Sequence, residues 1–251
     1  YTLFPYTTLF RSFANGDFWV VGPIKIVAID PQSVSVDGHV KNGSMVNPSP
    51  RDKFIGYDNT ICYIAIPYDE AKNVAFNLSP ERPLALATHS SLVSSISEDT
   101  PFQRPQLKRA AVLTVLASAA PAGSFRPPYC GTDKTVKFNK SMLNYSLLKR
   151  LPPVSKTPTL ETVADYFAAP WLDHYVGWRN DYLHPSLNMP HYGRDLHGQI
   201  GVGALMLHLD FEPEQKETLL CRYVQLGMDL YGVVNAGGLW SWVGEGGHGG
   251  G

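Results

Sequence analysis

The sequence has few cysteines, almost no net charge and no long apolar run, and each absence excludes a class of protein. Its three cysteines, Cys62, Cys130 and Cys221, lie far apart without the paired spacing of a zinc site, and their odd number leaves the redox compartment open. No apolar run approaches the roughly 18 residues that a membrane span needs. A formal net charge of −1 without a basic stripe lacks the electrostatic signature of nucleic-acid binding. We therefore expect no membrane insertion and no nucleic-acid partner.

Motifs of several enzyme classes are also missing. The chain holds no GxSxG elbow, HExxH helix, P-loop or EF-hand string. The string GEGGHG (244–249) has the glycine spacing of a dinucleotide-binding loop, but no predicted strand precedes it. A metal shared by His184, His191, His197 and Asp195 is disfavoured because Pro190 interrupts the segment. The sequence therefore predicts neither a cofactor nor a metal.

What the chain does have is an ordinary globular composition. Hydrophobic residues make up 44% and charged residues 17%, which excludes a mainly disordered chain. The length suits one large domain or two ordinary ones. Aromatic residues reach 12% and offer flat apolar faces, which suit sugar rings but are equally common in cores.

Residues 13–120 are predicted to form an antiparallel β-sandwich. Short apolar runs alternate here with turn dipeptides such as Asp37-Gly38 and Asn42-Gly43, at the spacing typical of sandwich strands. The expected strands fall in the runs 18–29, 62–66, 74–78, 84–96 and 110–117. Residues 107–123 imitate a signal peptide, but their position in the middle of the chain favours a buried strand.

The two ends of the chain carry unusual sequences. Residues 2–12, TLFPYTTLFRS, repeat one phrase and back-translate onto the sequence of a common short-read sequencing adapter, which they resemble. Residues 1–12 are therefore interpreted as an adapter artefact. Because the chain also lacks an initiating Met and ends in GGHGGG, we expect a fragment clipped at both ends, from environmental DNA.

Residues 157–251 are predicted to form helical hairpins, reached through a Pro-rich linker at 121–156. Thr157 and Pro158 supply an N-cap and a first helical residue for a helix that runs to Pro170. Three further helices are expected at 171–182, at 193–210 and from Pro213 to the glycines at 237 and 238. Glycines 198, 201 and 203 are expected where another helix packs very close.

The helical segments PWLDHYVGW, HPSLNMPHYGR and QKETLLCRYVQLGMDLYG carry a resemblance. They look like a group of uncharacterised bacterial proteins, and the arrangement of a β-domain beside helical hairpins resembles enzymes with an (α/α) toroid, such as polysaccharide lyases and six-hairpin glycosidases. The resemblance implies an α+β multidomain chain, in which an antiparallel β-sandwich precedes the hairpins of an incomplete toroid. In those enzymes the β-domain often follows the helices, whereas here it precedes them.

The densest polar cluster lies between two expected helices, at 184–195. A lyase that acts on uronic-acid polymers neutralises a carboxylate, removes the neighbouring proton and protonates the leaving oxygen. Asn or Arg can do the first, His or Tyr the second, and Tyr the third. The candidate catalytic residues are therefore Asn188, His191, Tyr192, Arg194 and, from the preceding helix, His174. Helix capping and loop hydrogen bonds explain the same residue types.

Candidate substrate-binding residues surround this cluster: Trp171, Trp178, Asp181, His184, Trp240 and Trp242. Tryptophan faces can stack on sugar rings. The alternative for the stripe that includes Trp171 and Trp178 is hydrophobic core, because helical spacing by itself predicts burial.

Two functions remain open on the sequence alone. The first is a fragment of a secreted or periplasmic carbohydrate-active enzyme, with a polysaccharide lyase favoured over a glycoside hydrolase. The second is a non-catalytic module that binds glycan or protein at a cell surface. Convergence of the polar residues on one concave pocket would favour the enzyme. The sequence determines neither the substrate nor the oligomeric state.

Overall fold

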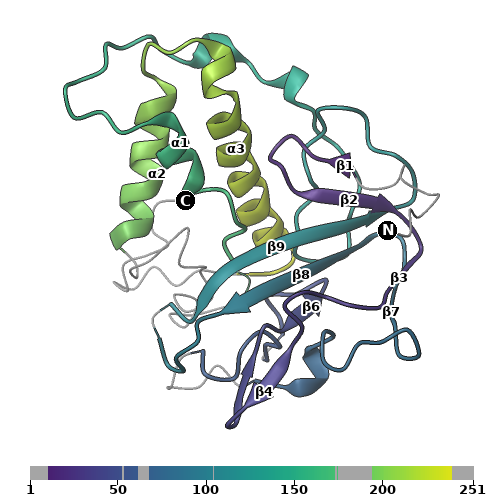
Figure 1. Ribbon diagram of the computed structural model, residues 1–251. Helices are drawn as coiled ribbons and strands as arrows, with labels where there is room; N and C mark the ends of the chain where they lie inside the picture. The colour runs from purple at the N-terminus through teal and green to yellow at the C-terminus, as the bar shows by residue number, and fades with distance from the viewer. Residues whose placement is uncertain are drawn as a thin grey trace, which may run out of the picture.

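The computed structural model describes residues 11–52, 54–61, 68–103, 105–172, 174 and 194–238 (Figure 1). In these ranges one five-stranded sheet, two two-stranded ribbons and three α-helices give a mixed α+β fold, as predicted at this coarse level. The main sheet has the spatial order β1 (Arg11–Ser12), β2 (Phe18–Val21), β9 (Leu107–Leu116), β8 (Ser90–Ser97) and β6 (Ser44–Val46). The ribbons pair β3 (Ile24–Ile26) with β7 (Leu84–Leu86), and β4 (Val34–Val36) with β5 (His39–Lys41).

The longest pairing in the sheet is the antiparallel ladder between β8 and β9. It confirms that the segment resembling a signal peptide contains a buried strand. Strand β2, however, joins β9 in parallel, so the sheet is mixed and not wholly antiparallel as predicted. The sequence pattern locates strands but does not identify the strands with which they pair. In the sequence, β3 to β8 all lie between β2 and β9, although these two strands are neighbours in the sheet.

Of two local predictions, the turn at Asp37-Gly38 is confirmed and the strand at 74–78 is wrong. Asp37 and Gly38 both have positive φ, 50° and 80°, as a two-residue hairpin between β4 and β5 requires. The run 74–78 is not a strand, and its Phe76 makes only an isolated bridge with Ser33. Asn77 in this run has a φ of 58°, which breaks the extended backbone. The predicted strand at 62–66 lies outside the described residues.

Both faces of the main sheet are covered. Val93 and Val112 pack on one face in a cluster that includes Tyr129 and Val233, the latter from helix α3 (Pro213–Asn235). Leu92 and its neighbours pack on the opposite face against residues of β3 and β7. Because adjacent strand residues point to opposite faces, Leu92 and Val93 serve two different cores. The helix-side core thus joins the expected sheet and helix domains.

The start and end of helix α3 agree with the prediction. It begins at Pro213, where the Gln215 side chain accepts a hydrogen bond from the backbone N–H of Glu212 at 2.9 Å. It ends at Asn235, and Gly237 follows with a φ of +92°.

Helix α1 (Leu160–Asp165) is shorter than predicted and begins two residues later. Its N-cap is Thr159, whose hydroxyl accepts from the N–H of Thr162 at 3.1 Å, and not Thr157. Thr157 instead closes a turn with Val154. Most of the expected helix at 171–182 lies outside the described residues.

Helix α2 (Arg194–Leu207) tests the expected role of its glycines. A Cβ at Gly203 would lie 2.8 Å from the Phe167 ring and 3.1 Å from that of Tyr223, which confirms close packing there. A Cβ at Gly198 or Gly201 would meet no described atom within 4 Å, so among the described residues close packing is found only at Gly203. The sequence did not show which side of α2 faces its neighbours.

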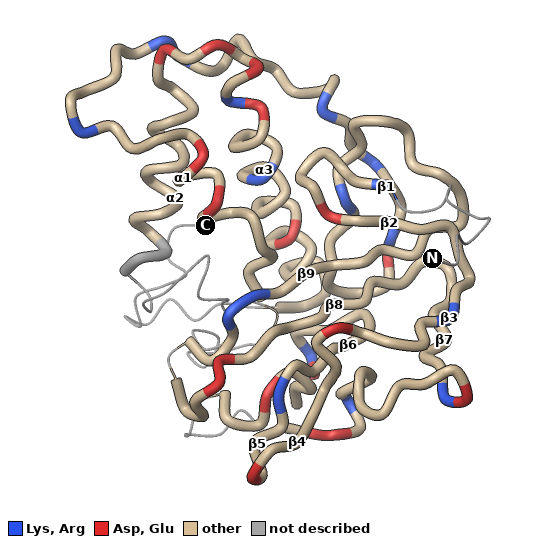
Figure 2. Tube along the Cα trace, in the orientation of Figure 1, with Lys and Arg blue, Asp and Glu red and all other residues tan. Residues whose placement is uncertain are grey.

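Three short 3-10 turns complete the described elements. They are η1 (Glu70–Lys72), η2 (Lys140–Met142) and η3 (Tyr145–Leu147). An Asp or Asn side chain immediately before each turn accepts from a backbone N–H inside it. Along the described part of the trace, basic and acidic residues are interspersed and do not gather by sign (Figure 2).

Candidate functional site

Two of the site residues predicted from the sequence lie in the protein interior. Trp171 is 1% exposed, stacks on Phe167 with ring centroids 5.8 Å apart and donates from Nε1 to the carbonyl of Tyr166. His174 is also 1% exposed and lies between the rings of Tyr57 and Tyr129, at 5.8 and 5.7 Å. Neither side chain has a surface that a polysaccharide could reach in this structure. For Trp171 the hydrophobic-core alternative is the better description.

The other predicted site residues cannot be assembled into a site. Arg194 is described only through its backbone, as the first residue of α2. The remaining candidates lie outside the described residues: Trp178, Asp181, His184, Asn188, His191, Tyr192, Trp240 and Trp242. Their roles stay predictions.

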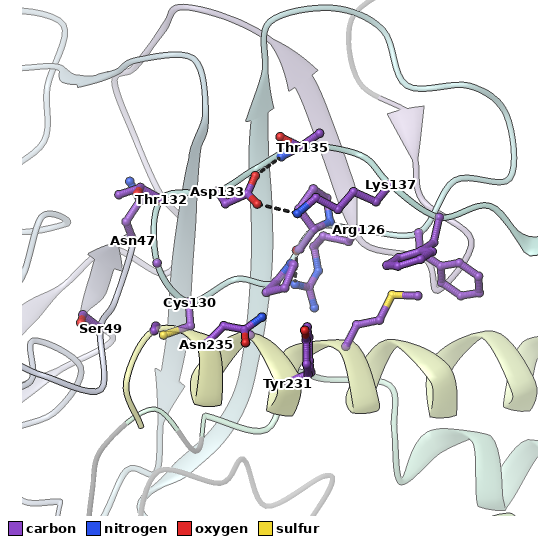
Figure 3. A pocket seen from close by; sticks show the side chains of 18 of the residues that line it. Asn47, Ser49, Arg126, Cys130, Thr132, Asp133, Thr135, Lys137, Tyr231 and Asn235 are labelled. Carbon is purple, nitrogen blue, oxygen red and sulfur yellow. Dashed lines mark hydrogen bonds and ion pairs between the residues drawn. The ribbon is translucent and has the colours of Figure 1, made fainter. Parts of the chain in front are cut away.

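A pocket of about 520 Å³ lies elsewhere, between the last turns of α3 and the segment 125–138 (Figure 3). From the helix it is lined by Met228, Tyr231, Gly232, Asn235 and Ala236, which recur at the spacing of one helix face. Figure 3 shows Tyr231 and Asn235 standing on the side of α3 that faces Asp133. The other lining residues are Asn47, Ser49, Arg51, Phe125, Arg126, Pro127, Pro128, Cys130, Gly131, Thr132, Asp133, Thr135, Lys137 and Phe138.

The segment 125–131 follows α3 closely and forms one wall of the pocket. Gln225 exchanges two hydrogen bonds of 3.0 Å with the backbone of Arg126, accepting from its N–H and donating to its carbonyl. Further along the helix, a Cβ at Gly232 would lie 2.2 Å from the Cβ of Pro128. Gly232 therefore permits the close approach of wall and helix.

A buried ion-pair cluster fixes this wall from within. The Arg126 guanidinium donates to both carboxylate oxygens of Asp229, at 2.8 and 2.6 Å, and from Nε to Asp17 at 2.6 Å. Burial raises the pKa of Asp229, while Arg126 opposes that shift. Burial acts to lower the pKa of Arg126, but Asp229 and Asp17 outweigh it and raise that pKa. The fork-shaped guanidinium suits this bidentate geometry.

A second buried cation holds the same wall in another way. Lys134 is 1% exposed, and its ammonium donates to the carbonyls of Pro128, Tyr129 and Cys130, at 2.7, 2.9 and 3.4 Å. Burial, together with the nearby charge of Arg126, lowers the pKa of Lys134 to about 7. These bonds satisfy three successive carbonyls behind the pocket.

Two titratable groups that line the pocket, Asp133 and Cys130, have shifted pKa values. The ammonium of Lys137, 2.6 Å away, and the N–H of Thr135 hold the pKa of Asp133 well below its usual range. Burial raises the pKa of the Cys130 thiol to about 12. At neutral pH Asp133 is therefore an ionised acceptor and Cys130 an uncharged thiol.

The two ends of the pocket differ in chemistry. One end is aromatic, since Phe125 and Phe138 line it and are joined by a hydrogen bond from the Phe125 N–H to the Phe138 carbonyl; the neighbouring Arg126 is bonded to Gln225 of α3. At the other end Gly131 donates to the carbonyl of Pro48, which brings the loop of Asn47 and Ser49 beside the end of α3. Figure 3 shows Asn47 and Ser49 together at that end.

The sequence interpretation missed this pocket because it treated 121–156 as a linker. One signal was present: the run FRPPYCGTDKTVKF (125–138) mixes aromatic, charged and polar residues densely. The segment instead carries core residues such as Tyr129, which is 0% exposed. Its prolines Pro127 and Pro128 form part of the pocket wall. A Pro-rich composition is the same for such a wall and for a spacer, so it could not tell the two apart.

In comparisons with family models, curated proteins and solved structures, nothing matches the chain. The described ranges contain no helix long and apolar enough to cross a membrane. The same ranges contain no group of three or more His, Cys, Asp or Glu side chains arranged to hold a metal ion.

Proposed function

We propose that this chain is a saccharide-binding module whose ligand occupies the pocket between α3 and the segment 125–138. The observation that carries the proposal is the combination of accessible rings and polar side chains in one concavity of about 520 Å³. Tyr231 is 66% exposed and Phe138 50% exposed, so both offer ring surface to a ligand. Asn47, Asp133 and Asn235 supply amide and carboxylate groups for hydroxyls.

The ionisation states of the lining favour binding over bond cleavage. General acid–base catalysis works best with a pKa near the operating pH. The pKa of Asp133 lies far below neutrality and that of Cys130 far above it. The buried Lys134, with a pKa of about 7, lies behind the wall and is bonded to its carbonyls. The states of Asp133, Cys130 and Lys134 thus suit recognition of a ligand.

The catalytic hypothesis stays a prediction in its original form. Polysaccharide lyase or glycoside hydrolase activity depends on residues 184–192, which lie outside the described residues. Completion of an (α/α) toroid, a full β-sandwich and a secreted or periplasmic location belong to the same prediction.

Calorimetric titration with short oligosaccharides tests the binding proposal. The probes are a neutral glucose trisaccharide and a galacturonate trisaccharide, and we expect saturable binding of at least one. Replacing Tyr231 with Ala is expected to weaken that binding about tenfold through loss of ring contact. Leu205→Ala is the matched control, because Leu205 on α2 is 65% exposed and lies outside the pocket lining.

Two results would contradict the proposal. One is the absence of heat or saturation with either probe, and the other is equal weakening by Tyr231→Ala and Leu205→Ala. Incubation of the galacturonate probe with the chain, followed by ultraviolet detection of unsaturated uronides, tests the catalytic hypothesis separately. Turnover that survives Tyr231→Ala would place catalysis outside this pocket.

A further inference from the structure

We infer that the saccharide bound in this pocket carries a carboxylate, held by Arg51 at the polar end. The inference rests on the proposed saccharide-binding function and adds the chemical class of the ligand and its orientation. Three observations carry it: the placement of Arg51, the pairing of the other charges around the pocket, and the difference between the two ends.

Arg51 is anchored at the end of α3. Its Nε donates to the carbonyl of Ala236 at 3.2 Å, and its backbone N–H donates to the Ser49 hydroxyl. Ala236 follows the last helical residue, where free carbonyls favour a cationic neighbour. A Cβ at Gly237 would lie 2.6 Å from Nε and 2.8 Å from Nη2, so Gly237 gives the guanidinium room to lie against the backbone.

Arg51 differs from the other cations near the pocket in its partner, because its Nε donates to a neutral carbonyl and not to a carboxylate. The Lys137 ammonium is paired with Asp133, 2.6 Å away. Arg126 is paired with Asp229 and Asp17. Arg51 therefore adds positive charge to the mouth of the pocket that its contact with Ala236 does not cancel. An arginine fork matches the planar geometry of a carboxylate.

The two ends of the pocket also give a bound ligand an orientation. From Met228 to Ala236 the helix advances about 12 Å, at about 1.5 Å per residue. Phe125 and Phe138 lie toward the first end, and Arg51 is bonded at the second. A saccharide with an acidic residue at one end would place that residue at Arg51 and its other rings beside Tyr231 and Phe138.

The test compares a galacturonate trisaccharide with its methyl-esterified form, by calorimetry on the full chain at low ionic strength. The ester has the same ring shape but no charge. We expect the wild-type chain to bind the acid about tenfold more tightly than the ester. Arg51→Gln is expected to abolish this preference, so that acid and ester bind with equal affinity. Arg51→Lys should keep part of the preference, because it keeps the charge but loses the fork.

Lys25→Gln is the matched control, since Lys25 is an exposed cation on β3, outside the pocket lining. It should leave the preference unchanged. Equal binding of acid and ester by the wild-type chain, or a preference that survives Arg51→Gln, would overturn the inference while leaving saccharide binding in place. Failure of both probes to bind would overturn the proposed function itself.

Discussion

The two buried cations behind the pocket wall show how different partners decide what a charge does inside a protein. Arg126 and Lys134 are each 1% exposed and lie close enough in sequence to support the same wall. Arg126 meets two carboxylates, so it remains a cation at every accessible pH. Lys134 meets three carbonyls and no carboxylate in its hydrogen bonds, and burial lowers its pKa to about 7. One site is a fixed ion pair, and the other responds to pH.

The largest expected effect comes from breaking the Arg126 pair. Asp229→Asn removes the carboxylate that binds the guanidinium through both oxygens and should lower the free energy of unfolding by about 3–5 kcal/mol, because Arg126 stays buried and charged with only Asp17 to balance it. Chemical denaturation measures this loss. Asp165→Asn is the control, since Asp165 is an exposed partner of Arg222 and should cost less than about 1 kcal/mol. Equal losses would show that burial does not separate the two pairs.

A double variant sharpens the same point. Replacing Arg126 with Met and Asp229 with Leu removes both buried charges together. We expect it to recover part of the stability that Asp229→Asn loses, because the only carboxylate left without its cation is that of Asp17, which is 12% exposed and keeps a hydrogen bond from Asn15. A double variant less stable than Asp229→Asn would indicate that the guanidinium contributes chiefly through its other contacts, with Asp17 and the carbonyl of Pro127.

The contact of wall and helix should give the next largest effect. Gly232→Ala places a methyl group 2.2 Å from Pro128 and should destabilise the fold by about 1–3 kcal/mol. Gly201→Ala is the comparison, since a Cβ there meets none of the described atoms within 4 Å and should stabilise α2 by about 0.5–1 kcal/mol. Thermal unfolding of both variants is the measurement. Similar shifts of the two melting temperatures would contradict the close packing at Gly232.

The pH response of Lys134 follows from its lowered pKa. Between pH 7 and 9 the unfolded chain binds more protons at this lysine than the folded chain does, so stability should rise with pH, by up to about 2 kcal/mol. Unfolding in denaturant at pH 7, 8 and 9 tests this slope. Lys134→Met should flatten the slope, whatever it does to stability at one pH. An unchanged slope in this variant would assign the effect to another group.

The smallest expected effect is at the surface. Asp133→Asn removes an exposed ion pair with Lys137, which should change the free energy of unfolding by less than about 1 kcal/mol. Denaturation at neutral pH measures it. A loss of unfolding free energy as large as that of Asp229→Asn would show that the exposed pair of Asp133 and Lys137 contributes as much as the buried pair of Arg126 and Asp229.

Much of the fold could be predicted where a short pattern decides it. The alternation of the β8 and β9 runs, the Asp37-Gly38 turn and the limits of α3 were all visible. The predicted N-cap at Thr157 failed because Thr159 lies two residues away and satisfies the same chemistry. The parallel pairing of β2 with β9 could not be predicted, because period-two alternation is the same for any partner.

The candidate site was much less accessible to sequence reasoning. Arg126 and Asp229 are 103 residues apart, and no local spacing links them. Arg51 meets Ala236 across 185 residues. Trp171 was conspicuous in the sequence as part of an aromatic stripe, and in the structure it is a buried residue that stacks on Phe167.

The sequence by itself determined the strands of the long hairpin ladder, the tight turn between β4 and β5 and the two ends of α3. These depend on side-chain alternation, positive-φ residues and helix capping, which act within a few residues. The tertiary structure alone decided that a Pro-rich segment becomes a pocket wall, that Lys134 is buried with backbone carbonyls as its hydrogen-bond partners and that Arg51 reaches the end of α3. Those outcomes depend on burial and on contacts between residues far apart in the chain, and both exist only after the chain has packed.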